Sequence, residues 1–219
     1  MRYILYFFYL EWYWGFRLAR FIIRYEISGE KKYGIHTLGL WRLPRALSFE
    51  DRKHFSRYEP LNYYTSSRLF NFLKPADLHT GFLDIGCGKG RLLAMAAAYG
   101  FSDITGIEFS KQLCEAATKV CGSIKTKYPN TSFDIEYADA RYYSIPESVG
   151  VIFLFNPFDA LIMEQFIRNV LESLERRNRP LKILYANPQC KQLWLDAGFR
   201  ETESFVKWRY LQGSVLEKI

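Results

Sequence analysis

The residue types most able to do chemistry gather in one glycine-rich stretch, 81–91, in which an acidic residue precedes three glycines at alternate positions. These residues are Asp84, Gly86, Gly88 and Gly90. The apolar run 82–85 predicts a buried strand before the glycines, and the run 92–98 predicts a helix after them, ending near Gly100. Glycine permits positive φ and leaves no Cβ in the way of a ligand, and a helix start offers free N–H groups. The stretch therefore predicts a site where backbone meets a small ligand.

The spacing of the glycines narrows the class of ligand that the loop could bind. A dinucleotide site uses G-x-G-x-x-G, whereas this chain reads G-x-G-x-G, with Arg91 where the third dinucleotide glycine would stand. A second acid, Glu108, lies at the end of the next predicted strand, 103–109. A carboxylate in that position can hold both hydroxyls of a ribose. Packing in an ordinary strand-to-helix turn would account for the glycines but not for Asp84 or Glu108.

Over about residues 65–219 the sequence resembles the class I S-adenosylmethionine-dependent methyltransferases. The resemblance implies that the D-x-G-x-G-x-G stretch meets the methionine part of the cofactor and that Glu108 binds its ribose. It also implies that Asp139, after a predicted strand 131–137, hydrogen-bonds the adenine amino group. The expected cofactor is S-adenosylmethionine, with S-adenosylhomocysteine as product and no metal. The residues expected to bind it are Asp84, Gly86, Cys87, Gly88, Gly90, Glu108, Phe109, Asp139, Ala140 and Asn156.

A third polar stretch follows the strongly apolar predicted strand 149–155 and reads Asn156-Pro157-Phe158. In the family this strand end faces the transferable methyl group, and enzymes that methylate amino groups often carry N-P-P-Y there. The resemblance thus implies a catalytic role for Asn156, Pro157 and Phe158. The chain lacks the second proline, which weakens an inference to a nucleic-acid base. A plain strand-to-helix turn, with Asp159 as N-cap of the next helix, is the competing interpretation.

The remaining elements complete an α/β pattern. A fifth predicted strand covers 181–186, and two more, 203–211 and 214–219, flank a turn at Gln212-Gly213. The resemblance implies a doubly wound, mostly parallel seven-stranded sheet of order 3-2-1-4-5-7-6, with the last strand antiparallel. We expect an N-terminal helical extension over 1–60 and the cofactor-binding domain over 61–219.

Residues 1–27 predict a single amphipathic helix. At helical spacing Arg2, Arg17, Arg20 and Arg24 fall on one stripe with several tyrosines, beside a wide apolar face. The apolar run is shorter than the about 20 residues of a membrane span. Two interpretations stay open: the helix lies on a membrane surface, or it packs on its own domain or a second subunit. In either case we expect it to lie outside the catalytic fold.

Charge and cysteine content limit the other possibilities. The 219 residues carry a formal charge of +7, but residues 1–80 hold 13 Lys/Arg against 7 Asp/Glu, while the rest hold 17 against 16. A nucleic-acid partner is therefore open but not favoured. The four cysteines form no C-x-x-C pair, which disfavours zinc and suits a reducing compartment. Cys87 is expected to be a small packing residue rather than a nucleophile. The protein is expected to be cytoplasmic, and peripheral attachment to a membrane is left open.

The expected function is methyl transfer to an unidentified acceptor. The favoured class of acceptor is an amine, on a protein side chain or a small molecule. Asn156 could hold an uncharged amine without a formal base. Alternatives are a non-catalytic cofactor-binding or scaffolding protein, and a methyltransferase of nucleic-acid bases. Aminopropyl transfer is disfavoured because it usually needs carboxylates where Asn156 stands.

Overall fold

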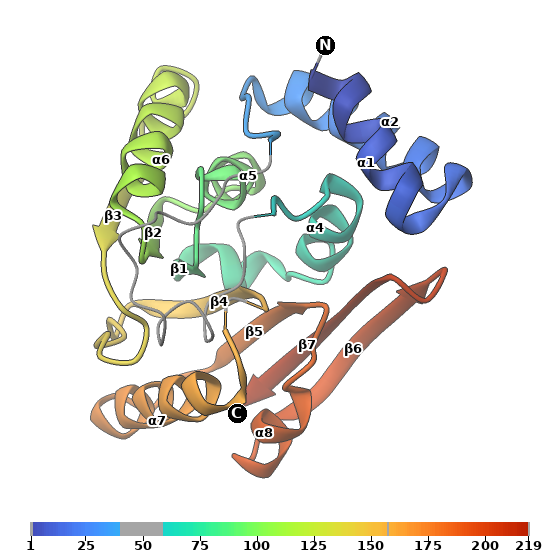
Figure 1. The fold of residues 1–219 in the computed structure, drawn as a ribbon. Coiled ribbons are helices and arrows are strands. Elements are labelled where there is room, and N and C mark those ends of the chain that lie inside the picture. Colours follow the sequence, from blue (N-terminus) through green and yellow to red (C-terminus); the bar gives the residue numbers. More distant parts are fainter. Residues whose placement is uncertain (1, 40–58, 157, 219) are drawn as a thin grey trace.

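The computed structural model describes residues 2–39, 59–156 and 158–218. Its centre is a seven-stranded sheet of order β3-β2-β1-β4-β5-β7-β6 (Figure 1). The strands β1 to β5 run parallel, and β7 is antiparallel to both β5 and β6. The strands are β1 (Gly81–Ile85), β2 (Asp103–Glu108), β3 (Ser132–Tyr137), β4 (Val149–Phe155), β5 (Leu181–Ala186), β6 (Arg200–Lys207) and β7 (Leu211–Lys218). The predicted order and the antiparallel last strand are confirmed.

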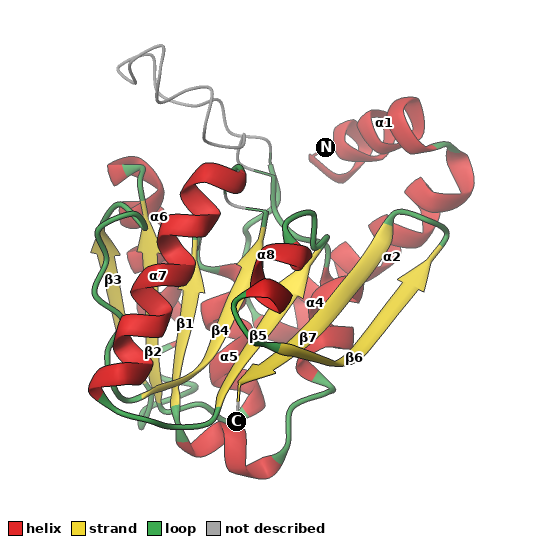
Figure 2. Cartoon of the chain, turned by 90° about the horizontal axis from the view of Figure 1, so that it is seen from below, coloured by secondary structure: helices red, strands yellow, loops and turns green. Residues whose placement is uncertain are grey.

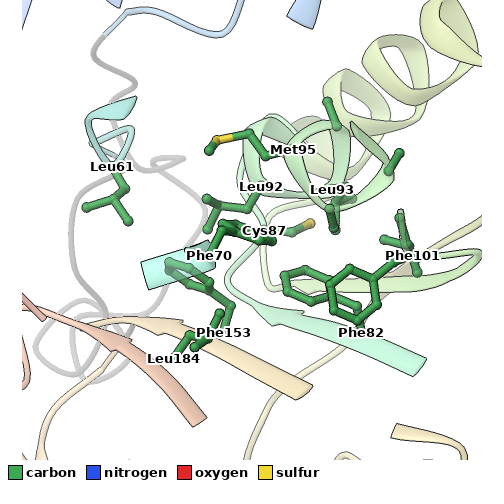
Figure 3. Close-up of a cluster of buried hydrophobic side chains, with 14 of the residues drawn as sticks. Leu61, Phe70, Phe82, Cys87, Leu92, Leu93, Met95, Phe101, Phe153 and Leu184 are labelled. Atoms are coloured by element: carbon green, nitrogen blue, oxygen red, sulfur yellow. The ribbon is translucent and has the colours of Figure 1, made fainter. Parts of the chain in front are cut away.

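Helices cover both faces of the sheet (Figure 2). One face packs under α4 (Tyr63–Phe70), α5 (Arg91–Tyr99) and α6 (Lys111–Ile124), and the other under α7 (Ala160–Arg176) and α8 (Lys191–Asp196). A short 3-10 helix, η1 (Pro75–His79), leads into β1. Successive strand residues point to opposite faces, so Phe82 joins the first layer (Figure 3) and Leu83 the second. Continuous burial of the central strands explains why they read as unbroken apolar runs.

The turn between β6 and β7 differs from the prediction. It lies at residues 208–210, where Trp208 and Arg209 adopt φ of 53° and 64°. Gly213 instead lies within β7, where a Cβ would come 2.8 Å from side-chain atoms of Leu69 and Phe205. The Gln212-Gly213 turn is therefore wrong, because that glycine serves close packing and two non-glycine residues make the left-handed turn.

The N-terminal segment forms two helices, α1 (Arg2–Trp14) and α2 (Phe16–Tyr33), and the single helix predicted there is wrong. Gly15, at φ 81°, breaks the run, and α1 folds back along α2 (Figure 1). Arg2 at the start of α1 pairs with Glu30 near the end of α2 at 2.9 Å. The stripe of cations and tyrosines predicted along one helix is thus divided, with Tyr6 buried between the two helices.

A buried ion pair joins α2 to the domain. Arg91 Nη1 lies 2.9 Å from Glu26 Oε1, and Arg91 Nη2 lies 2.8 Å from Glu26 Oε2. Glu26 has no exposed surface. Arg91 also donates from Nη1 to the Leu61 carbonyl and from Nε to Thr37 Oγ1. Its guanidinium lies 4.2 Å from the centre of the Tyr63 ring. Residues 16–33 therefore pack on the domain, as one of the two interpretations of this segment expected. The place of residues 1–27 outside the catalytic fold and the boundary at residue 60 stay predictions.

This pair generates a stability prediction. Glu26→Ala should lower the free energy of unfolding by about 3–5 kcal/mol, because it leaves the Arg91 charge buried and unpaired. Glu172→Ala, an exposed glutamate of α7, is the matched control and should change it by less than about 0.5 kcal/mol. Urea unfolding measures both. The pair has no such role if the two variants unfold alike.

Candidate active site

The glycine loop lies at the carboxyl end of β1 and leads into α5. Gly86, Gly88 and Gly90 have φ of 74°, 54° and 80°, which is the left-handed region that residues with a Cβ rarely adopt. A Cβ on Gly90 would also come 3.2 Å from the backbone of Ala117 in α6. The alternate spacing seen in the sequence thus reflects three left-handed positions in one loop.

Asp84 is a buried acid directly before this loop, with 2% of its surface exposed. Its Oδ2 accepts no hydrogen bond from the described part of the chain. Burial raises the pKa of the Asp84 carboxyl well above its usual range, and the charge of Glu108 raises it further. A carboxylate in this state is stabilised by a cationic hydrogen-bond donor, and the ammonium of a methionine group is one. The residues present therefore fit the expected cofactor, although direct contact stays a prediction.

Glu108 links the end of β2 to the loop. Its Oε2 accepts the N–H of Gly88 and its Oε1 accepts the N–H of Ser110, each at 2.9 Å. Burial raises the pKa of the Glu108 carboxyl, and these backbone N–H groups oppose that shift. Each oxygen still has a lone pair that can accept from a hydroxyl. Its position and geometry suit two neighbouring ribose hydroxyls, and that role stays a prediction.

Cys87 turns its side chain into the core beneath the loop (Figure 3). A Cβ on Gly106 of β2 would come 2.9 Å from the Cys87 sulfur, so the thiol fills the space that this glycine leaves. Burial raises the pKa of the Cys87 thiol well above its ordinary value, which keeps it protonated near neutral pH. The packing interpretation is confirmed. A cofactor contact from its backbone stays a prediction.

Asp139, expected near the adenine, follows β3 and is held by Arg141. The Arg141 Nε and Nη2 donate to Asp139 Oδ2 at 2.9 and 2.6 Å, and the Arg141 backbone N–H donates to Oδ1 at 2.9 Å. Ala140 is buried, and its carbonyl accepts from Asn169 of α7 at 3.0 Å. The turn is thereby fixed from two sides. No sequence pattern indicated that Arg141 and Asn169 hold this turn. The adenine role of Asp139 stays a prediction.

Two asparagines stand side by side where β4 and β5 end. Asn156 and Asn187 have φ of 37° and 48°, and the strand residues before them, Phe155 and Ala186, are paired in the sheet. Gln212 of β7 donates to Asn187 Oδ1 at 2.9 Å. Asn187 was not among the expected site residues, although the repeated Asn-Pro after two strands was a signal for it. The left-handed backbone suits asparagine better than most residues.

The residues after Asn156 divide between the two interpretations of this stretch. Asp159 caps α7, since its Oδ1 accepts the N–H of Ile162 at 3.2 Å. Phe158 is buried with its ring 6.0 Å from that of Phe166 in the core. Pro157 lies outside the described residues. The capping role of Asp159 is confirmed. Packing against Phe166 weakens the catalytic role that the resemblance implies for Phe158, and that role stays a prediction.

Phe109, beside Glu108, is partly exposed and its ring lies 6.4 Å from that of the exposed Tyr137. Within residues 2–39, 59–156 and 158–218, no group of three or more His, Cys, Asp or Glu side chains could hold a metal ion. No helix in this part of the chain is long and apolar enough to cross a membrane.

Comparisons with known proteins concern the domain family and the fold. Residues 82–180 match the family model of a methyltransferase domain. No curated protein matches the chain. Among solved structures, a Pyrococcus horikoshii protein provisionally named an RNA methyltransferase matches at TM-score 0.58 and 15% identity, over 89% of this chain and 96% of its own.

Two further solved structures show the same fold. An S-adenosylmethionine-dependent methyltransferase from Mesorhizobium loti matches at TM-score 0.51 and 12% identity, over 70% of this chain and 96% of its own. The magnesium protoporphyrin IX methyltransferase of Synechocystis, solved with bound S-adenosylmethionine, matches at TM-score 0.50 and 17% identity. The match covers 70% of this chain and 77% of its own. At these identities the likeness concerns the fold.

The first prediction from the site concerns Glu108. Glu108→Ala should weaken binding of S-adenosylhomocysteine about tenfold to a hundredfold, because hydrogen bonds to a charged group contribute about 1.5–3 kcal/mol. Asp103→Ala, an exposed acid at the opposite end of β2, is the control and should leave affinity unchanged. Calorimetric titration measures both. Equal affinities for the Glu108 variant and the unaltered protein would remove Glu108 from the ribose site.

The second prediction concerns the pH dependence of cofactor binding. A cationic ligand favours the ionised form of Asp84, so binding should release protons at pH values below the raised pKa of the free protein. Affinity for S-adenosylmethionine should therefore rise with pH until that pKa is passed. Asp84→Asn should reduce this dependence, leaving the part due to Glu108. Titrations in buffers of different ionisation enthalpy report the proton release, and an identical pH dependence in Asp84→Asn would contradict the assignment.

Proposed function

Because the chain carries a class I S-adenosylmethionine-dependent methyltransferase domain, we propose that it transfers the cofactor's methyl group to an amine nitrogen. The observation that carries this proposal is the neutral Asn156, which stands in a left-handed conformation at the carboxyl end of β4. That strand pairs directly with β1, so Asn156 follows the strand beside the glycine loop. The amide is thus on the edge where the acceptor would meet the cofactor.

The chain's own residues divide the work between cofactor and acceptor. The bound cofactor supplies a methyl group on a positively charged sulfur, so the protein needs to align the acceptor and exclude water. Glu108 and Asp84 would hold the ribose and the ammonium. The Asn156 amide oxygen would accept a hydrogen bond from an uncharged amine, which turns the nitrogen lone pair toward the methyl group. The proton lost on transfer can leave to solvent.

A base of RNA is a second candidate acceptor, favoured by a different observation. The Pyrococcus horikoshii structure provisionally named an RNA methyltransferase matches over 89% of this chain. Tyr142, exposed to 81%, follows Arg141 beside the turn that contains Asp139. An exposed ring next to a cation can stack on an unpaired base. The nearly neutral charge of residues 81–219 supports the amine instead.

The proposal predicts a specific effect of Asn156→Gly. Glycine allows the left-handed backbone and removes only the side chain, so cofactor affinity should fall much less than methyl transfer. Methyl transfer should fall about tenfold, the effect of losing one hydrogen bond of about 1–1.5 kcal/mol. Asn187→Gly, which removes an amide already bonded to Gln212, is the matched control and should have a smaller effect.

In the assay the protein is incubated with radiolabelled cofactor and, in parallel reactions, with one of three acceptors. These are a lysine-rich protein, a small primary amine and bulk transfer RNA. Label in either amine that depends on Asn156 supports the proposal. Label in RNA alone would favour the second candidate. Equal transfer by Asn156→Gly and the unaltered protein would show that Asn156 only shapes the turn.

A further inference from the structure

The outward face of α1 is apolar although it faces solvent. Tyr6 and Leu10 of this helix are buried against α2, and the opposite face exposes Leu5 to 66%, Phe8 to 61% and Trp12 to 85%. Spacing of about four residues places these three side chains on one stripe. A patch of this kind is rare on proteins that stay alone in water.

The tip of the β6–β7 hairpin packs against the neighbouring ends of α1 and α2, on the side of α1 that also carries the buried Leu10. The Trp14 and Tyr210 rings lie 4.6 Å apart, and the Phe21 and Trp208 rings lie 4.8 Å apart. Both views show the α1–α2 turn and the hairpin tip side by side at one end of the molecule (Figures 1 and 2). Segments almost 200 residues apart in the sequence therefore lie together at one end of the molecule, where both expose aromatic side chains. We call this surface the aromatic platform and define it by Leu5, Phe8, Trp12, Phe16, Trp208 and Tyr210.

Positive charge predominates in the segments that carry the platform. Residues 5–25 and 206–210 contain five Lys or Arg and one acid, Glu11. Arg17, Arg20 and Arg209 are exposed, and the Lys207 ammonium lies 5.0 Å from the centre of the Trp208 ring. Three of the five tryptophans of the chain lie in these two segments. Trp and Tyr favour the headgroup level of a membrane, and Lys and Arg favour anionic lipid.

We propose that the aromatic platform binds the surface of a membrane containing anionic lipids. The aromatic side chains enter the boundary between headgroups and acyl chains, and the surrounding cations pair with lipid phosphates and carboxylates. No helix in the described part of the chain is a candidate span, so the protein would lie on the surface. The proposal is independent of the methyl acceptor.

Charge argues against a second copy of the chain as the occupant. The commonest dimers have two-fold symmetry and bring the same patch of both copies together. Here that arrangement would place five cations against five, and like charges across an interface are costly. An anionic surface removes this repulsion and covers the apolar side chains as well.

Co-sedimentation of the full chain with vesicles tests the proposal. We expect binding to vesicles of phosphatidylcholine with phosphatidylserine, weakening as salt is raised, and little binding to phosphatidylcholine alone. Leu5→Ser should weaken binding, while Leu161→Ser, on α7 and exposed to 65% against 66% for Leu5, should not. Arg17→Gln should lower the partition coefficient about fivefold, and Arg168→Gln, an exposed arginine of α7, should leave it unchanged.

Circular dichroism checks that each variant folds. If Leu5→Ser does not fold, Trp208→Asn replaces it, because asparagine tolerates the left-handed backbone at that position. Failure to bind the anionic vesicles overturns the proposal, and so does an equal loss with Leu161→Ser. Self-association that Leu5→Ser abolishes, without lipid binding, would identify a second copy as the occupant.

Discussion

The structure of the site depends on two carboxylates, the buried Asp84 and the half-buried Glu108, at the carboxyl edge of the sheet. They lie near the carboxyl ends of neighbouring parallel strands, and the charge of Glu108 raises the pKa of Asp84. An ionised carboxylate in such a place is costly unless it is paired or well hydrogen-bonded. Glu108 is satisfied in part by two backbone N–H groups, one of them from the glycine loop. A cationic ligand with hydroxyls would satisfy the rest, and this is the chemistry of the cofactor that the domain implies.

The same loop is held from the opposite side by the N-terminal helices. Arg91 begins α5 directly after Gly90, and its guanidinium is buried against Glu26 of α2 and over the Tyr63 ring. The residue that stands in place of a dinucleotide glycine thus anchors the extension to the loop. Rigid support of this kind keeps a binding loop in one geometry. The Arg91–Glu26 pair also fixes α2, on which α1 packs, while the outward face of α1 stays exposed.

The sequence predicted the sheet well because its signals are local and strong. The runs 149–155 and 181–186 match β4 and β5 at both ends, and Asp159 caps α7 as expected. Three features depended on contacts that no pattern contains. Gly15 breaks a run that is apolar enough to continue as a helix, and the break is favoured because α1 can then pack on α2.

The other two features are the hairpin turn and the surroundings of the site residues. Trp208 and Arg209 take up a left-handed turn that glycine would favour, because Gly213 is committed to close packing inside β7. The ring of Phe158 packs in the core against Phe166. Which side chain faces a ligand is decided by packing partners from distant elements, so residue types and spacing indicated a candidate site but not the orientation of each residue in it.

The central claim is that Asp84 and Glu108 together bind S-adenosylmethionine through its ammonium and its ribose. A crystal structure of the full chain with S-adenosylhomocysteine tests it most directly. The account predicts both ribose hydroxyls within hydrogen-bond distance of the Glu108 carboxylate, with the amino group of the ligand on the Asp84 side of the glycine loop. A ligand bound away from the loop, or a ribose that does not touch Glu108, would contradict it.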